Sequence, residues 1–284
     1  MSHAQLISAQ ELHQHLNQPN WVILDCRFSL ENPCYGHTAF LEGHIPGAQE
    51  CNLDQHLSSR IITGKTGRHP LPTPEHFSMQ LRHWGINNDS TIVLYDDASN
   101  AFSARAWWLL AWLGKRDNVF ILDGGVKAWT SAGYAVSQDT PEVSEGNFTG
   151  TPDPTMLIDA KTLQQRLNNA DLTLLDARAP NRFRGEDENK DPVAGHIPNA
   201  QCAFFMENLQ ADGHFLPADQ LKARFSRLLA DRPFASLVTY CGSGVTACHN
   251  LFALSLAGYP LAPLYAGSWS EWILNPERPI ATGA

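Results

Sequence analysis

The chain has 284 residues, of which 43% are hydrophobic and only 17% charged, and its formal net charge is −9. This composition excludes a disordered chain and predicts a packed protein of about two domains. An acidic balance argues against a nucleic-acid partner, which would require a basic surface. No apolar run approaches the roughly 20 residues of a membrane helix, and the N-terminus lacks a signal-peptide pattern. We therefore expect a cytoplasmic protein without a membrane partner.

Four motifs recur in the same order in the two halves of the sequence, which indicates a duplicated domain. Between the repeats, residues 137–156 are rich in Pro, Gly, Ser, Thr and acidic residues, which is typical of a linker. We therefore predict domains at 1–136 and 157–284. The matched motifs are ISAQELHQHLNQPNWVILDCR and IDAKTLQQRLNNADLTLLDAR, GHIPGA and GHIPNA, IVLYD and LVTYC, and GGVKAW and GSWSEW.

Each repeat shows strands alternating with helices, which predicts an α/β fold with a mostly parallel sheet flanked by helices. Ser8 and Asp159 are the expected N-caps of the first helix of each repeat. Ligands of such sheets bind beyond the carboxyl ends of the strands. The other expected elements are strands at Trp21–Leu24, Thr91–Tyr95, Val119–Leu122, Leu172–Leu175, Ser236–Tyr240 and Leu261–Tyr265, and helices at Ala104–Leu113 and Thr246–Ala257.

Cys241 is the one cysteine in a setting that predicts chemistry, because the segment CGSGVT at 241–246 joins an expected strand to an expected helix. Its glycines allow a tight curl with inward N–H groups, and the helix N-terminus adds positive charge. Both features would stabilise a thiolate or a persulfide. Cysteine phosphatases place an arginine six residues after the cysteine, where this chain has Ala247, so we set that chemistry aside. The other five cysteines are expected to be structural.

Together, the duplicated LDxR, GHIPxA and Gly-x-x-x-x-Trp motifs and the CGSGVTA segment resemble the two-domain rhodanese-type sulfurtransferases, most closely the 3-mercaptopyruvate sulfurtransferases. The resemblance implies two rhodanese-like domains of which only the second is catalytic. Asp96 stands where the second repeat has Cys241, and a carboxylate cannot carry sulfane sulfur. Gly242 and Ser243 are neutral, which in this family suits a monocarboxylate donor better than thiosulfate.

The resemblance also implies the substrate-binding residues. Arg182, in the segment DAR…RFRG, would hold the donor carboxylate, and Ser243 would donate a hydrogen bond to its carbonyl. The second arginine that these enzymes usually carry downstream is missing, so Lys190 or Arg184 would assist. A relay between Ser243 and His44 is a further hypothesis. The remaining expected contacts come from Gly242, Gly244, Val245 and Thr246.

The implied reaction is a two-step sulfur transfer without metal or organic cofactor. The Cys241 thiolate attacks the donor sulfur, pyruvate leaves, and a thiol such as thioredoxin, or cyanide, takes the outer sulfur of the persulfide. Two alternatives remain open: thiosulfate as the donor, and a sulfur carrier that does not catalyse. The duplicated Asp176 and Arg178, the GHIP histidines and the paired Trp107 and Trp108 are interpreted as structural.

Overall fold

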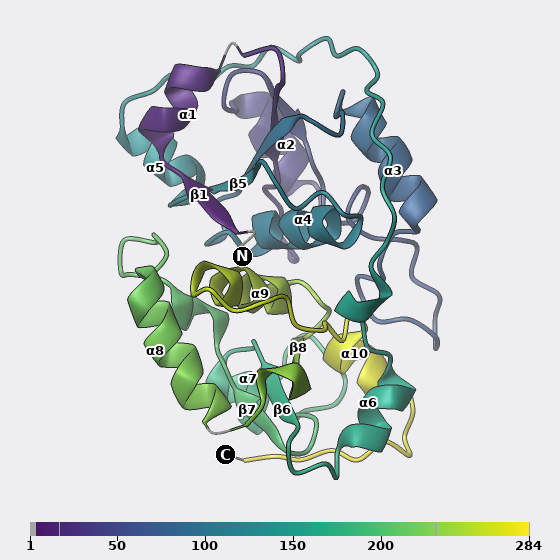
Figure 1. Cartoon of the computed structure of the whole chain (residues 1–284). Coiled ribbons are helices and arrows are strands. Elements are labelled where there is room, and N and C mark those ends of the chain that lie inside the picture. Colours follow the sequence, from purple (N-terminus) through teal and green to yellow (C-terminus); the bar gives the residue numbers. More distant parts are fainter. Residues whose placement is uncertain (1–3, 17, 231, 284) are drawn as a thin grey trace.

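The N-terminal half of the computed structural model, the upper part of the molecule in Figure 1, contains a five-stranded parallel sheet. Its strand order is β1-β5-β4-β2-β3. The structure describes residues 4–16, 18–230 and 232–283. In this half the elements are β1 (Gln5–Ile7), α1 (Ala9–His15), β2 (Trp21–Asp25), α2 (Tyr35–Glu42), β3 (Ala48–Glu50), α3 (Pro74–His83), β4 (Thr91–Tyr95), α4 (Ala101–Trp112), β5 (Val119–Leu122) and α5 (Gly125–Ser131).

The C-terminal half repeats this plan around a parallel sheet with strand order β7-β6-β8. The expected strand at Leu261–Tyr265 is wrong as a strand: only Leu264 pairs, through isolated bridges to Leu157 and Thr239. Pro260 and Pro263 remove two backbone donors there. The elements are α6 (Ala160–Arg166), β6 (Thr173–Asp176), α7 (Pro180–Arg184), β7 (Ala200–Cys202), α8 (Ala218–Leu229), β8 (Leu237–Tyr240), α9 (Thr246–Leu256) and α10 (Ser268–Trp272), with 3-10 turns at Pro154–Met156, Phe205–Asn208 and Phe234–Ser236.

Local sequence signals set the helix starts and the turns. Ser8 forms a complete capping box with Glu11, and Asp159 accepts a hydrogen bond from the Thr162 N–H group, as predicted. The aspartate of each LDxR motif holds the arginine of that motif, and the arginine donates onward to the carbonyl oxygen of the GHIP glycine. The duplicated motif is therefore structural, because it joins a strand end to a turn in both halves.

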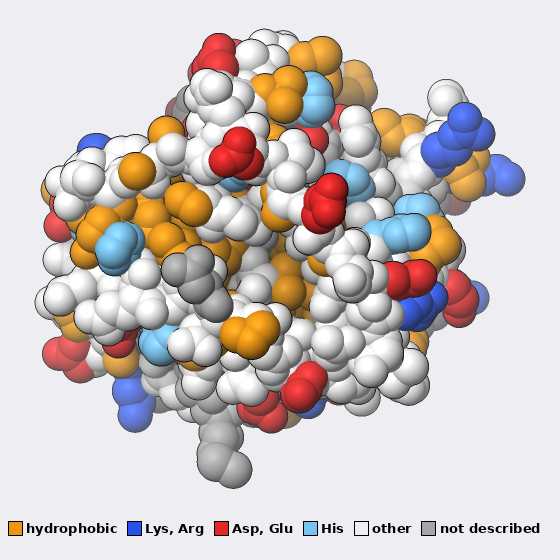
Figure 2. Space-filling model, turned by 90° about the horizontal axis from the view of Figure 1, so that it is seen from above, with side chains coloured by type: hydrophobic (Ala, Val, Ile, Leu, Met, Phe, Trp, Pro, Cys, Tyr) orange, Lys and Arg blue, Asp and Glu red, His pale blue; other side chains and the backbone are white. Residues whose placement is uncertain are grey.

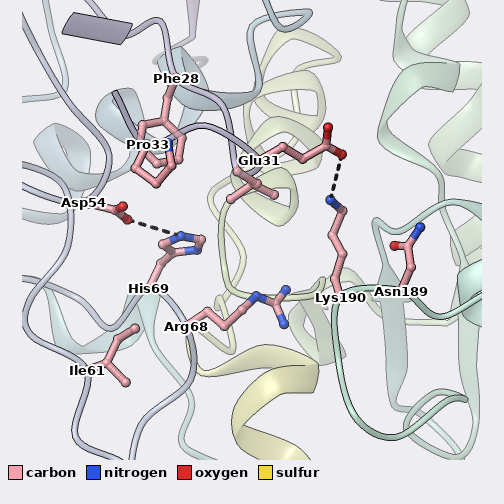
Figure 3. Close-up of a pocket in the computed structure, with 10 residues that line it drawn as sticks. Phe28, Glu31, Pro33, Asp54, Ile61, Arg68, His69, Asn189 and Lys190 are labelled. Carbon is pink, nitrogen blue, oxygen red and sulfur yellow. Dashed lines mark ion pairs between the residues drawn. The ribbon is translucent and has the colours of Figure 1, made fainter. Parts of the chain in front are cut away.

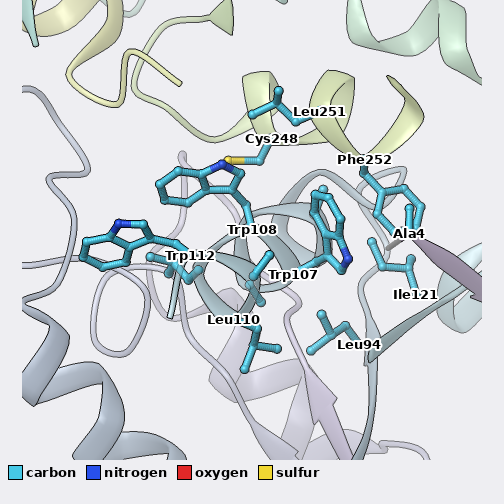
Figure 4. Close-up of a cluster of buried hydrophobic side chains, with 14 of the residues drawn as sticks. Ala4, Leu94, Trp107, Trp108, Leu110, Trp112, Ile121, Cys248, Leu251 and Phe252 are labelled. Carbon is cyan, nitrogen blue, oxygen red and sulfur yellow. The ribbon is translucent and has the colours of Figure 1, made fainter. Parts of the chain in front are cut away.

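Alternate strand residues face two different cores. In the first sheet, Ile23 and Val93 pack with Trp129 of α5, whereas Leu94 faces α4. That second face belongs to a core cluster that runs into the C-terminal half, where α4 packs against α9 (Figure 4). Trp107 meets Phe252 of α9 edge to face, with ring centroids 5.0 Å apart. Trp107 and Trp108 are therefore core residues, and the two domains share one apolar interface.

Residues 137–153 run along the N-terminal half without regular secondary structure, held by backbone hydrogen bonds and by the buried ring of Phe148. Figure 2 shows the face of the molecule formed by the N-terminal domain. This face carries scattered acidic side chains and no continuous basic stripe. Among the described residues, no helix is long and apolar enough to cross a membrane.

Candidate active site

Cys241 follows β8 directly and is 2% exposed, at the wall of a cavity of about 220 Å³. The N–H groups of Gly242, Ser243, Gly244 and Val245 have no acceptor within the described parts of the chain. Gly244 has φ +78°, and a Cβ there would clash with the Ala266 carbonyl oxygen, so the curl requires glycine. The loop that begins at Cys241 therefore carries four free N–H donors, to which an anion could bind.

The N-terminal domain supplies a histidine to this loop. His69 Nδ1 lies 2.8 Å from Ser243 Oγ, and its Nε2 lies 3.5 Å from Asp54 Oδ1. Burial, reinforced by the charges of Arg105 and Arg68, lowers the pKa of His69 to about 3. The ring is therefore neutral near pH 7, and it has one N–H donor and one acceptor nitrogen for its two neighbours, Ser243 Oγ and Asp54 Oδ1.

The proposed relay between Ser243 and His44 is wrong. His44 Nδ1 bonds the Phe40 carbonyl oxygen and Nε2 the Asp139 carbonyl oxygen, which leaves no contact with Ser243. His196 is likewise a turn histidine, bonded to the Phe183 carbonyl oxygen. Sequence reasoning chose the duplicated GHIP histidine and missed His69, which lies in the unduplicated segment GKTGRHP.

Two arginines, one from each domain, flank the loop. Asp191 bridges them, accepting hydrogen bonds from Arg68 Nη1 and from Arg182 Nη2, the latter at 3.1 Å. Arg182 also forms a forked pair with Glu188. This leaves Arg68 Nη2 and Arg182 Nη1 without acceptors in the described structure, and both lie beside Gly242. A Cβ at Gly242 would lie 2.8 Å from Arg68 Nη2.

The charges around the cavity nearly cancel. Arg178, which also lines it, is paired with Asp176 and Glu188. The three arginines therefore face three carboxylates, those of Asp176, Glu188 and Asp191, and Lys190 adds one positive charge. An incoming anion finds free N–H donors in an almost neutral pocket, which favours a single negative charge over two.

The other expected contact residues divide into two groups. Gly242, Ser243, Val245, Thr246 and Lys190 line the cavity with Cys241 and Arg182. Arg184 does not line it; its guanidinium is paired with Glu186 at 2.7 Å on the outer side of α7. Gly244 does not line the cavity either, and its positive φ angle allows the loop to curl. Trp269 and Trp272 are fully buried in the second-domain core and do not line the cavity.

Arg105 of α4 supports the loop from beneath. This fully buried side chain donates to the carbonyl oxygens of Gly244 at 3.0 Å and of Leu57 and His69 at 3.2 Å. It therefore ties the segment that carries Arg68 and His69 to the cysteine loop.

Cys248 lies in the α4–α9 interface next to Trp108 (Figure 4), and burial raises the pKa of its thiol to about 12.

In the N-terminal domain, the loop that corresponds to the Cys241 loop is filled by the side chain of Asp96. Both carboxylate oxygens of Asp96 accept hydrogen bonds, Oδ1 from the N–H groups of Ala98 and Asn100, and Oδ2 from those of Phe102 and Ser103 and from Ser103 Oγ. Asp96 is fully buried at the edge of a cavity of about 310 Å³. Among the described residues, no group of His, Cys, Asp and Glu is arranged to hold a metal ion.

Comparisons with known proteins show the family to which the chain belongs. A family model described as a rhodanese-like domain matches residues 8–132 and again 159–275. A Pseudomonas aeruginosa protein named "Probable 3-mercaptopyruvate sulfurtransferase" is 59% identical over 100% of both chains. The thiosulfate sulfurtransferase of Gallus gallus is 32% identical, covering 82% of this chain and 79% of its own length.

The crystal structure of SseA from Escherichia coli, described as a 3-mercaptopyruvate sulfotransferase with the rhodanese fold, superposes with a TM-score of 0.81 at 30% identity. The match covers 94% of this chain and 100% of that one. The two-domain α/β architecture expected from the motifs is therefore confirmed. The chain belongs to the rhodanese family of sulfurtransferases, as a tandem of two rhodanese-like domains.

Proposed function

We propose that the protein transfers sulfane sulfur from 3-mercaptopyruvate to a thiol acceptor through a persulfide on Cys241. The observation that carries the choice of donor is the pair of free guanidinium nitrogens on Arg68 and Arg182 beside Gly242, in a nearly neutral cavity. A carboxylate can accept one hydrogen bond from each arginine while its α-carbon chain extends toward Cys241.

The chain's own residues divide the work of the first step. The Cys241 thiolate attacks the donor sulfur, an S–S bond forms, and the C–S bond breaks with its electron pair on pyruvate enolate. The enolate oxygen accepts hydrogen bonds from Ser243 Oγ–H and the free loop N–H groups, and a proton from solvent completes pyruvate. His69 positions the serine hydroxyl. In the second step, an acceptor thiolate attacks the outer sulfur and Cys241 leaves as thiolate.

Thiosulfate is the second candidate donor, favoured by the relatives that carry that name. Its two negative charges would meet a cavity whose arginines are already paired with carboxylates. Steady-state kinetics with both donors and cyanide as acceptor decide between them. We expect kcat/KM for 3-mercaptopyruvate to exceed that for thiosulfate by at least about tenfold, equivalent to about 1.4 kcal/mol. A thiosulfate preference of that size would overturn the choice.

The same experiment distinguishes an enzyme from a sulfur carrier. A carrier would take up one sulfur atom, release one equivalent of pyruvate and stop, even with acceptor present. The proposed enzyme releases many equivalents per active site. Counting pyruvate against protein concentration, with intact mass to detect the added sulfur, gives the answer directly.

A further inference from the structure

A second cavity adjoins the Cys241 cavity. It has a volume of about 480 Å³, and Leu30, Arg68 and Lys190 line both spaces. Its walls come mostly from the N-terminal domain, with two residues of the C-terminal domain on the opposite side (Figure 3). The remaining lining residues are Phe28, Glu31, Pro33, Asp54, Ile61, His69 and Asn189.

The lining of this second cavity combines apolar surface with charges of both signs. Leu30 and Ile61 expose 45% and 62% of their surface, although both are large aliphatic residues. Glu31 reaches across toward Lys190, with 3.8 Å between Oε1 and Nζ (Figure 3). The Glu31 side chain is 87% exposed, so this ion pair contributes little and either partner can re-pair with a ligand.

We propose that this cavity binds the sulfur acceptor, and that the acceptor is a zwitterionic low-molecular-weight thiol of the cysteine class. The inference rests on the proposed function, since it concerns the second half of the same reaction. An ammonium group would pair with Glu31, and a carboxylate with Lys190 or the outer edge of Arg68. The apolar side chains of Phe28, Pro33 and Ile61 would contact the carbon chain.

Size favours a small acceptor over a protein. The cavity volume falls within the range of about 300–1,000 Å³ typical of small-molecule sites. Cys241 is 2% exposed and lines the adjoining cavity of about 220 Å³ but not this one, so an acceptor sulfur must pass from the second cavity into the first to meet the persulfide. The acceptor thiolate then bonds the outer sulfur, the bond from that sulfur to Cys241 Sγ breaks, and its electron pair returns to Sγ.

The first test removes the proposed ammonium partner with Glu31→Gln. Four acceptors are compared, so that the roles of the ammonium and carboxylate groups can be separated. They are L-cysteine, which has both groups, cysteamine, which lacks the carboxylate, 3-mercaptopropionate, which lacks the ammonium group, and cyanide, which has neither. In a ping-pong reaction, kcat/KM for the acceptor is independent of the donor step. We expect about a fivefold loss for cysteine and cysteamine, with 3-mercaptopropionate and cyanide within about twofold of wild type. Equal losses for all four acceptors, or no loss for any, would overturn the proposal.

The second test uses neighbouring isoleucines as a matched pair. Ile61 lines the cavity, whereas Ile62 is 53% exposed and does not. Ile61→Ser should lower kcat/KM about threefold for the three thiols and leave cyanide unchanged, while Ile62→Ser changes nothing. Reduced thioredoxin is tested as a fifth acceptor. If its kcat/KM with wild-type enzyme exceeds that of cysteine, and if Glu31→Gln and Ile61→Ser both lower its kcat/KM more than they lower that of cysteine, the surface binds a protein instead.

The experiments can show separately that the proposed donor is wrong and that the proposed acceptor site is wrong. If wild-type enzyme releases no pyruvate from 3-mercaptopyruvate, the donor assignment fails. The four acceptors can then be compared on enzyme loaded from thiosulfate, and their order still tests the second cavity.

Discussion

The loops after β4 and β8 are two copies of one turn with opposite uses. Asp96 fills its own loop, accepting hydrogen bonds from four backbone N–H groups and one hydroxyl. Cys241 leaves the donors of its loop free within the described structure. From this comparison we infer that the turn suits an anion. Where the chain supplies a carboxylate, the turn is a structural element, and where it supplies a thiol, we propose that the turn is the reaction site.

The two domains also cover each other's loops. His69 of the N-terminal domain contacts Ser243, while His249 of α9 lies against the backbone of Ser99 in the Asp96 loop. The segment around Met206–Gly213 lines the Asp96 cavity as the segment around Arg68 lines the Cys241 cavity. What differs is the charge: Lys127 is the only cation in the Asp96 cavity lining within the described chain, and no arginine is present. The arginine pair thus distinguishes the two sites.

The largest effect is expected from exchanging the residue at the start of each loop. Cys241→Ser should reduce turnover by at least about 10⁴-fold, because the nucleophile is lost. Adding Asp96→Cys to that variant should restore nothing, since the first cavity has no arginine to hold the donor. Pyruvate release and intact mass after donor exposure measure both. Sulfur uptake by the double variant, absent from Cys241→Ser alone, would contradict the contrast between the two cavities.

The next effect concerns stability rather than activity. Asp96→Ala leaves four buried N–H groups without an acceptor and should lower the free energy of unfolding by about 3 kcal/mol. Cys241→Ala removes only a small side chain from a loop whose donors are already free, so about 1 kcal/mol or less is expected. Urea titrations of both variants and of Asp96→Asn, which keeps one acceptor oxygen, provide the measurement. Equal losses for the two alanine variants would break the comparison.

The arginine pair should come next. Arg182→Ala and Arg68→Ala should each raise KM for 3-mercaptopyruvate by about 30-fold, equivalent to about 2 kcal/mol for a charged hydrogen bond. Arg184→Ala, outside the cavity, should leave KM unchanged. Initial-rate kinetics with cyanide as acceptor give the values. A large effect at Arg184 and none at Arg68 would show that the carboxylate binds elsewhere.

The contrast between Arg68 and Arg182 also shows how far sequence alone could go. The parallel α/β pattern, the helix caps and the strand-end cysteine follow from hydrophobic periodicity and local turn chemistry, so they were predictable. Arg182 lies within a motif, shortly after a strand, and was predictable by resemblance. Arg68 and His69 lie in a loop of the other domain, more than 170 positions before Cys241 in the sequence. Only the packing of α4 on α9 brings that loop to the site.

A pH dependence of stability, which has no effect at pH 7, separates buried from exposed histidines. Burial lowers the pKa of His249, like that of His69, to about 3. In the unfolded chain the pKa of a histidine is about 6.5, so below that pH each of these histidines binds a proton in the unfolded state but not in the folded state. Stability is therefore complete above pH 6.5 and is lost as the pH falls toward 3, by up to about 1.4 kcal/mol per pH unit for each histidine.

His249→Gln should remove one of these contributions and flatten the fall in unfolding free energy between about pH 6.5 and 4.5. The substitution itself is destabilising, because the imidazole stacks on Phe215, so the slopes rather than the absolute values are compared. His83→Gln, at an exposed position, is the matched control and should keep the wild-type slope. Because His249 belongs to the Asp96 side of the interface, its variant should also leave the pH profile of sulfur transfer unchanged. Parallel stability curves for wild type and His249→Gln would mean that this histidine is protonated in the folded protein.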